Sequence, residues 1–194
     1  VGITESLIPS LEKLKNSLSE KSEEFWDVIK TGRTHLQDAT PIRLGQEFLG
    51  YSGQIDESIK RAKNSLNELS ILALGGTAVG TGIGMQKGFS KKVIEKLSKR
   101  FKINFTESSN HFHSQSTIDS IVSSSGSLKT IAVSLMKIGN DIRWLGSGPR
   151  AGIGEIELPE VQPGSSIINE GFSIKSINTQ SSNVPTQEGL EDND

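Results

Sequence analysis

Apolar residues recur at helical spacing from the start of the chain. Their steps place them on one side of a helix. Pro9 either starts this helix or kinks it, because proline lacks an N–H and crowds the preceding turn. Thr31 and Gly32 are expected to end it, since glycine is favoured just past a helix. The apolar set consists of Ile3, Leu7, Leu11, Leu14, Leu18, Phe25, Val28 and Ile29.

A second apolar set predicts a clearer helix. Its steps of three and four residues average close to the 3.6-residue period of a straight helix. Gly75 and Gly76 are expected to stop this helix, and the polar residues 33–41 before it are expected to form a loop. The set consists of Leu44, Phe48, Tyr51, Ile55, Ile59, Ala62, Leu66, Leu69 and Ala73.

Two more helices follow an irregular, glycine-rich stretch at 75–88. Ser90 is expected to cap a short helix that runs to Phe101. The next helix steps alternately by three and four residues, the heptad spacing of helices packed at shallow angles. Three of its members are small and permit close approach of a neighbouring helix. This last set consists of Ile118, Ile121, Ser125, Leu128, Ala132, Leu135, Gly139 and Ile142.

These patterns predict an all-α fold, a bundle of long helices, and no segment shows a convincing strand alternation. Two of the helices are roughly 30 residues long, against about 11–12 for an average helix. Because three such helices cannot enclose a core of that length alone, we expect other copies of the chain to complete the bundle.

The character of the chain changes after Gly146. Residues 1–146 are assigned to the helical domain and 147–167, which begin rich in glycine, to the start of a loop region. Residues 168–194 are rich in Ser, Asn, Gln and Thr and end on acidic residues. Such a segment buries too little apolar area to offset its ordering entropy, so we expect it to be disordered.

The composition of the chain excludes several kinds of partner and site. Of the 194 residues, 33% are hydrophobic and the net charge is -2. The sequence contains no run of 18 apolar residues, so no membrane span and no membrane partner are expected. Lys and Arg are spread along the chain, so no nucleic-acid partner is expected. The absence of cysteine excludes disulfides and thiolate zinc sites. No cofactor and no metal is expected.

The segment 32–39 gathers several groups that carry chemistry into one loop. Arg33 and Thr34 are suited to binding a carboxylate, and the imidazole of His35 to moving a proton near neutral pH. From the residues alone the signal is modest, because a single histidine in a loop is more often a capping or solvent-facing group.

Three other patterns give weaker evidence for a functional site. The glycine-rich run 75–82 has no preceding strand and no following Gly-Lys-Ser/Thr, so we reject a phosphate loop and expect backbone packed closely on backbone. His111 and His113 do not share a helix face, and no carboxylate or thiolate adjoins them to complete a metal site. Ser165 and Ser166 follow a proline without a base at fixed spacing.

Taken together, the segments resemble the class II fumarases of the fumarase/aspartase superfamily. The run 30–41 (Lys-Thr-Gly-Arg-Thr-His-Leu-Gln-Asp-Ala-Thr-Pro) with Leu-Gly-Gln-Glu at 44–47 resembles their second active-site segment. Residues 74–82, 134–145 and 147–156 are similar to later blocks in the same order. Aspartases typically carry Gln at the position of His35 and Asn at that of Gly154, so both positions favour a fumarase.

The resemblance implies reversible addition of water to fumarate, giving L-malate, in a homo-oligomer that is tetrameric in the family. It places Ser165 where the catalytic base stands, with Ser166 touching substrate. It assigns His35 to activating or protonating the water and Thr34 to binding a substrate carboxylate. It also implies a chain in the cytoplasm or the mitochondrial matrix.

The sequence departs from the family after Ile167. The family continues with Met-Pro-Gly-Lys-Val-Asn-Pro, whereas this chain reads Ile-Asn-Glu-Gly-Phe-Ser at 168–173, without the substrate-binding Lys and Asn. Glu188 only faintly matches the carboxylate that pairs with histidine. The N-terminal and C-terminal domains have no counterpart here. Three explanations of residues 168–194 remain open: a frameshifted or misannotated gene, an alternative splice form, or a truncated paralogue.

Two alternatives to an impaired fumarate hydratase remain. The lost Lys and Asn favour a non-catalytic helical module that assembles with full-length fumarase subunits. An aspartase-type ammonia lyase is a more distant alternative that His35 disfavours.

Overall fold

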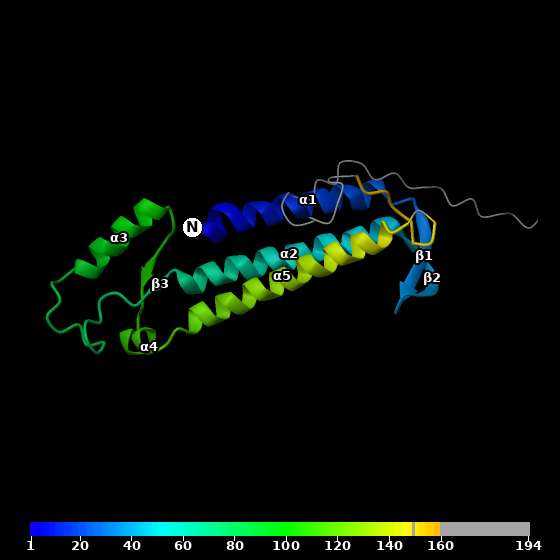
Figure 1. Ribbon diagram of the computed structural model, residues 1–194. Helices are drawn as coiled ribbons and strands as arrows, with labels where there is room; N and C mark the ends of the chain where they lie inside the picture. The colour runs from blue at the N-terminus through cyan, green and yellow to red at the C-terminus, as the bar shows by residue number, and fades with distance from the viewer. Residues whose placement is uncertain (149, 160–194) are drawn as a thin grey trace, which may run out of the picture. The chain divides into compact units, whose positions relative to one another are not determined.

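The fold is described from a computed structural model, which covers residues 1–148 and 150–159 (Figure 1). Two compact units divide the chain between Ile138 and Gly139, inside the last long helix. The expected domain boundary at residue 146 stays a prediction, and the expected disorder of 168–194 lies outside the described residues.

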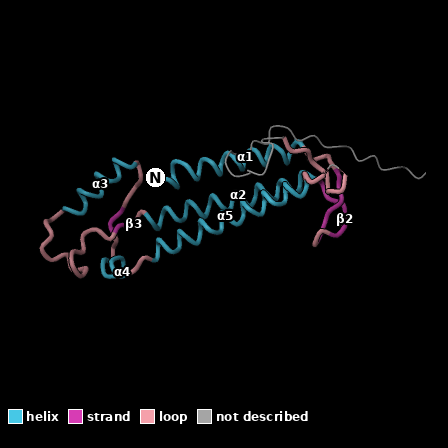
Figure 2. The backbone as a smooth tube through the Cα atoms, in the orientation of Figure 1, coloured by secondary structure: helices cyan, strands magenta, loops and turns pink. Residues whose placement is uncertain are grey.

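Helix α1 (Ile8–Glu24) packs along helix α2 (Leu44–Leu69) in the first unit (Figure 2). A five-residue π-helical stretch, Ile3–Leu7, leads into α1, and Pro9 lies in the first turn of α1. Leu7 and Ile8 keep right-handed helical backbone angles, so the helical path is continuous through Pro9. Pro9 therefore lies where the π-helical stretch changes to the regular α-helix, next to the turn that a proline ring crowds.

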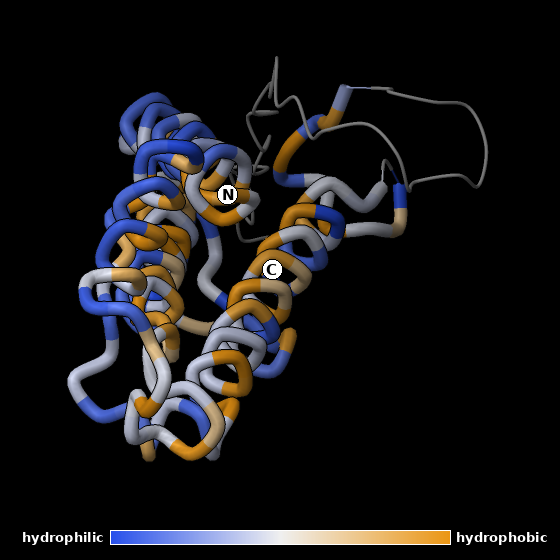
Figure 3. The backbone as a smooth tube through the Cα atoms, turned by 90° about the vertical axis from the view of Figure 1, so that its left-hand side faces the viewer, coloured by the Kyte–Doolittle hydropathy of each residue, from blue (hydrophilic) through white to orange (hydrophobic). Residues whose placement is uncertain are grey.

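The core between α1 and α2 is made mostly by the apolar positions that the periodicity singled out, although Ile8 is an addition and Ile29 of the predicted set is 69% exposed. Phe48 and Leu18 are fully buried, and the Phe48 ring stands edge-on to Phe25 at 5.3 Å and to Tyr51 at 5.6 Å between ring centres. Edge-to-face pairs at this distance add to the free energy of burial. Figure 3 shows polar and apolar positions segregated around the helices. The other buried apolar residues here are Ile8, Leu11, Leu44, Ile55, Ile59 and Ala62.

The first helix is shorter than expected, and residues 33–41 are not a loop. Strands β1 (Ile29–Thr34) and β2 (Gln37–Arg43) form an antiparallel hairpin with an irregular step between Thr31 and Arg33. Backbone bonds from Leu44 N to Val28 O and from Gly45 N to Phe25 O fix the chain reversal. Because most of the hairpin is exposed, it shows no apolar alternation, and the expectation of no strand was wrong.

Segment 70–118 is built from short elements. Strands β3 (Ile71–Leu72) and β4 (Thr106–Glu107) pair in parallel, with α3 (Phe89–Phe101) between them and α4 (His111–Ser116) after them. Ser90 is not the cap of α3, since Gly88 holds that position with φ 79°. Ser90 instead donates to Glu107 Oε2 at 2.7 Å.

Helix α5 (Asp119–Leu145) confirms the last long helix, but its buried stripe matches the expected seam only in part. Ile142 is buried as expected, whereas Ile121 and Leu128 are 58% and 40% exposed. Ser124, Ile131 and Ile138 are buried instead. Within the first unit, Lys137 Nζ lies 4.9 Å from the centre of the Tyr51 ring on α2. The mainly helical bundle is thus confirmed, with one apolar face of α5 exposed.

Candidate functional site

The hairpin β1–β2 presents the histidine that the sequence singled out at its tip. Thr34 pairs with Gln37, which leaves His35 and Leu36 as a two-residue turn. Both turn residues have positive φ, 51° and 63°. Hairpin turns of this kind favour Asn and Gly, and other residues held there are strained. Backbone strain of this type concentrates at functional sites.

Thr34 and His35 are both exposed. In the described part of the chain, no side chain or backbone group forms a hydrogen bond with the His35 imidazole. The side chain is therefore available to a ligand or to another chain. An imidazole and a hydroxyl side by side are suited to proton transfer and to holding a carboxylate.

A largely buried ion pair fixes the hairpin to α2. Lys30 Nζ donates to both carboxylate oxygens of Glu47, at 2.8 and 2.9 Å, and only 7% of the Lys30 side chain is exposed. On the same strand, Gly32 is buried, and a Cβ there would lie 2.5 Å from Thr40 O on the neighbouring strand β2. These contacts orient the strand that carries Thr34. The sequence analysis quoted Lys30 and Glu47 in the resemblance without assigning them this role.

Arg43 joins the base of the hairpin to the end of α1. Its guanidinium donates to Trp26 O at 2.8 Å and lies 3.3 Å from an Asp27 carboxylate oxygen. Its backbone N–H donates to the side chain of Gln46 in the first turn of α2 at 2.9 Å. The hairpin is therefore held at both its strands and its base, while the tip stays open.

The glycine-rich segment 75–82 folds closely on its own backbone, as expected, because Gly80 N and Gly82 N both donate to Gly76 O, at 2.9 and 3.0 Å. It also packs on side chains, which the sequence did not indicate. A Cβ at Gly75 would lie 2.7 Å from Glu107 Oε1, and one at Gly80 would lie 2.8 Å from the Phe112 ring. A Cβ at Gly76 would overlap the Gln115 amide, which donates to Thr77 O at 2.7 Å. Small residues are needed here because α4 and Glu107 lie so close.

Each of the two neighbouring histidines has a carboxylate beside it, contrary to the sequence expectation. His111 Nε2 lies 3.2 Å from Glu107 Oε1 and 3.2 Å from Leu74 O, within hydrogen-bonding distance of both oxygens. His113 Nε2 lies 3.6 Å from Asp119. Within 1–148 and 150–159, no three His, Asp or Glu side chains are grouped to hold a metal ion.

An open cavity of about 630 Å³ lies beside α4 in the first unit. Its lining includes Glu68, Glu107, His113 and Asp119. Neither Thr34 nor His35 reaches it, so the cavity and the hairpin tip are separate features.

In the second unit, the backbone at Gly154 and Glu155 turns back to bond with the end of α5 and the residue that follows it closely. Ser147 O accepts from Gly154 N at 2.6 Å, and Ser147 Oγ accepts from Ile153 N at 3.0 Å. Gly148 and Gly154 have φ of 156° and 59°, the second in the left-handed region. Ser165, Ser166 and Glu188 lie outside the described residues, so their roles stay predictions.

Comparison with known proteins agrees with the resemblance. The sequence model of the family described as "Lyase" matches residues 2–168. This chain belongs to that lyase family. Fumarate hydratase class II of Helicobacter pylori is 51% identical over 166 residues, which are 86% of this chain and 36% of that protein. Mitochondrial fumarate hydratase of Saccharomyces cerevisiae is 53% identical over 166 residues, 86% of this chain and 34% of that protein.

Among solved structures, class II fumarase from Schistosoma mansoni matches with a TM-score of 0.77 and 38% identity, over 83% of this chain and 37% of that one. The similarity to class II fumarases is thereby confirmed in sequence and fold. The chain spans about a third of the length of the curated relatives it matches. No helix in the described part of this lyase chain is long and apolar enough to cross a membrane.

Proposed function

We propose that this chain is a segment of a fumarate hydratase, contributing to the reversible hydration of fumarate to L-malate. The observation that carries the proposal is the hairpin tip, where a strained two-residue turn exposes His35 beside Thr34 while a buried ion pair fixes the strand behind it. Its sequence is the segment that the resemblance to class II fumarases rests on. The expected ligand is therefore a small dicarboxylate.

The reaction needs a base that removes a proton next to a carboxylate, and donors that stabilise the resulting charge. In the proposal, Thr34 binds a substrate carboxylate and His35 activates or protonates the water. By resemblance, Ser165 is the base, Ser166 contacts substrate and Glu188 is a candidate carboxylate partner for a histidine.

The isolated chain should hydrate fumarate poorly or not at all. The family's Lys and Asn after the serine pair are replaced here by other residues. Loss of a single donor to a developing negative charge typically lowers turnover about 100- to 1,000-fold. Turnover of roughly 10 per second, an ordinary enzyme value, measured by fumarate absorbance on the chain alone would contradict this part of the proposal.

A complementation experiment tests the proposal directly. A full-length class II fumarase with its own Thr-His pair replaced is refolded together with this chain, and fumarate hydration is measured. The chain should restore activity by supplying Thr34 and His35, and a chain carrying His35→Gln should not. If parent and His35→Gln chains restore equally, the imidazole has no part in the reaction. If neither restores activity although they co-assemble, the segment is not catalytic.

The second candidate is a non-catalytic module that assembles with fumarase subunits. It is favoured by the exposed apolar face of α5, since apolar stripes of this size on a soluble chain mark interfaces. Ile121, Val122, Val133 and Met136 on that helix are all more than half exposed. In either case we expect self-association, with the family's tetramer as the reference, in the cytoplasm or the mitochondrial matrix.

Gly139→Leu tests assembly through α5. Apart from the adjoining backbone of α5, a Cβ at Gly139 meets no atom of the described residues within 4 Å. A larger side chain should therefore act mainly on a neighbouring copy. Overpacking of a helix contact costs roughly 1–3 kcal/mol, so association should weaken about fivefold or more. A monomer at all concentrations by light scattering, unchanged by the substitution, would contradict assembly.

A further inference from the structure

Residues 87–102 carry a concentration of positive charge that the net charge of the whole chain does not reveal. Seven basic residues and one acidic residue give this segment a net charge of +6, so the remainder of a chain of net charge -2 carries -8. This corrects the view that Lys and Arg are evenly spread. The seven are Lys87, Lys91, Lys92, Lys96, Lys99, Arg100 and Lys102.

All seven cations are exposed, on α3 or at its two ends. Within residues 1–148 and 150–159, none of them forms an ion pair, whereas on α1 and α2 Lys15, Lys21 and Lys60 each lie within 3.0 Å of a carboxylate oxygen. The charge on α3 is therefore not neutralised inside the chain. A surface of this kind attracts anions through the summed field of its charges.

Helix α3 is held on the protein by one side. Ile94 is 7% exposed, and Ser90, 5% exposed, donates to Glu107. These two residues fix the inner side of the helix. The opposite side faces solvent.

The outer face of α3 mixes cations with apolar side chains. Phe89, Lys92, Val93, Lys96 and Arg100 are spaced by three, four, seven and eleven residues and so share one face. Phe89 is 49% exposed and Val93 is half-buried. Lysine and arginine next to an exposed aromatic ring suit a bilayer surface, where the ring enters the acyl boundary and the charged ends reach the headgroups.

The glycine-rich segment before α3 offers further apolar contacts. Val79 is 69% exposed and Ile83 is 79% exposed, and no described residue covers them. We propose that α3, together with Val79 and Ile83, docks peripherally on an anionic lipid surface. This departs from the expectation of no membrane partner and is independent of the hydration activity.

A nucleic acid would also be attracted by the cations, but the observations favour lipid. The solvent-facing side of α3 carries no Asn or Gln between its cations, the amides that most often read base edges besides arginine. Exposed Phe89, Val79 and Ile83 have a natural environment at the acyl boundary and none along a phosphate backbone.

Vesicle sedimentation tests the proposal on the whole chain. The chain should sediment with vesicles of phosphatidylcholine containing phosphatidylserine, less so as salt rises, and not with phosphatidylcholine alone. Lys92→Glu with Lys96→Glu should weaken binding by about 25-fold or more, at roughly fivefold for each cation lost. Lys13→Glu with Lys129→Glu, an equal charge change at exposed positions elsewhere, should weaken it far less.

Phe89→Ser separates the two classes of partner. It keeps every cation, so it should weaken vesicle binding while leaving any binding to duplex DNA unchanged. Helix content by circular dichroism confirms that each variant folds. Absence of vesicle binding by the parent, equal losses in the two charge-reversal pairs, or tighter binding to DNA than to vesicles without any effect of Phe89→Ser would each overturn the proposal.

Discussion

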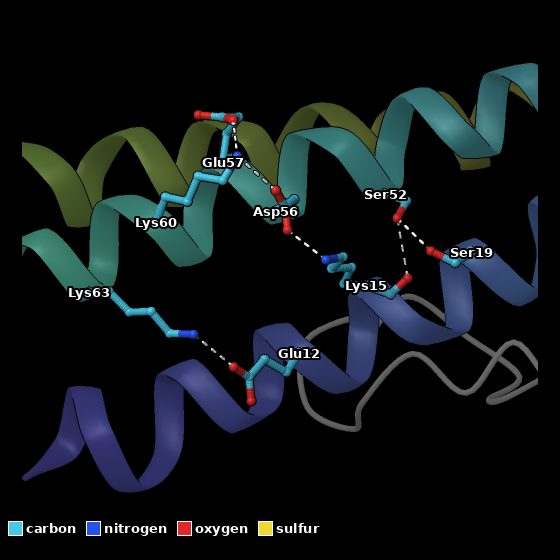
Figure 4. A network of polar contacts seen from close by, with 8 residues as sticks. All are labelled: Glu12, Lys15, Ser19, Ser52, Asp56, Glu57, Lys60 and Lys63. Carbon is cyan, nitrogen blue, oxygen red and sulfur yellow. Dashed lines mark hydrogen bonds and ion pairs between the residues drawn. The ribbon is translucent and has the colours of Figure 1, made fainter.

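In the helix pair α1–α2, cations lie beside carboxylates; in segment 70–118 the cations of α3 face solvent. Lys15 and Lys60 both contact Asp56, and Lys63 contacts Glu12, so charges tie the outer sides of the pair together (Figure 4). Ser19 and Ser52 share a hydrogen bond of 2.7 Å across the same contact. In segment 70–118, Glu107 lies 3.2 Å from His111, and among the described residues none of the α3 cations has a carboxylate partner.

The two regions are therefore stabilised by different interactions. The helix pair combines a continuous apolar core with neutralised charge, which suits a rigid support for the hairpin. Segment 70–118 has few large buried side chains, Ile94 among them, and leaves its charge available. Regions with fewer buried contacts open more readily, so we expect segment 70–118 to exchange amide hydrogens faster than α1 and α2.

The largest expected effect is on the core of the helix pair. Phe48→Ala removes a fully buried ring that contacts Phe25 and Tyr51 edge-on. It should lower the free energy of unfolding by about 3–5 kcal/mol, measured by urea denaturation. Phe101→Ala, at a ring 37% exposed on α3, should cost about 1 kcal/mol. Equal losses would contradict the contrast between the two regions.

The next effect concerns the support of the hairpin. Lys30→Met leaves the Glu47 carboxylate partly buried without its cation, at a cost of about 1–3 kcal/mol. Adding Glu47→Leu should recover part of that loss, because the uncompensated charge is removed. Nuclear magnetic resonance signals of His35 should broaden in the single variant as the tip loses its fixed position. Unchanged His35 signals would show that the ion pair does not orient the turn.

Substitutions at two glycines compare a closely packed position with one that has free space around it. Gly76→Ala would force the Gln115 amide aside and should destabilise segment 74–82 by about 1–3 kcal/mol, seen as faster hydrogen exchange there. Gly53→Ala meets nothing within 4 Å on α2 and should stabilise that helix by roughly 0.5–1 kcal/mol. The same sign at both positions would contradict the packing of the glycine-rich segment on α4.

The smallest effect is the pH dependence of the charged network. Hydrogen bonds from Lys15 and Lys60 lower the pKa of Asp56 from 3.8 to about 2. A carboxyl with a lowered pKa stabilises the fold above its unfolded pKa, and this contribution is lost as the pH falls. Asp56→Asn should therefore destabilise the chain at neutral pH, and the difference should shrink as the pH falls from about 4 towards about 2, the folded pKa.

The double variant Asp56→Asn with Lys15→Met serves as its control. Because the two side chains share one interaction, the second substitution should add little to the first. A difference between parent and Asp56→Asn that persists at pH 2 would show that charge is not the cause.

Periodicity by itself determined the long helices and the core of α2. Leu44, Phe48, Ile55 and Ala62 are buried as their spacing predicted, because a helix repeats its face every 3.6 residues and burial follows that repeat. The order of its motifs also indicated the similarity to class II fumarases. Both signals are local in the sequence, which is why they can be read without coordinates.

Only the tertiary structure decided the hairpin and the distribution of charge. A hairpin that is exposed over most of its length has no continuous apolar face and so no alternating pattern. Its register depends on bonds to Phe25 and Val28 just past the end of α1. Which residues of α5 are buried likewise depends on which face of the helix packs against the rest of the protein. The contrast between paired and unpaired lysines arises because Asp56 and Glu12 come from helices that are distant in sequence and adjacent in space.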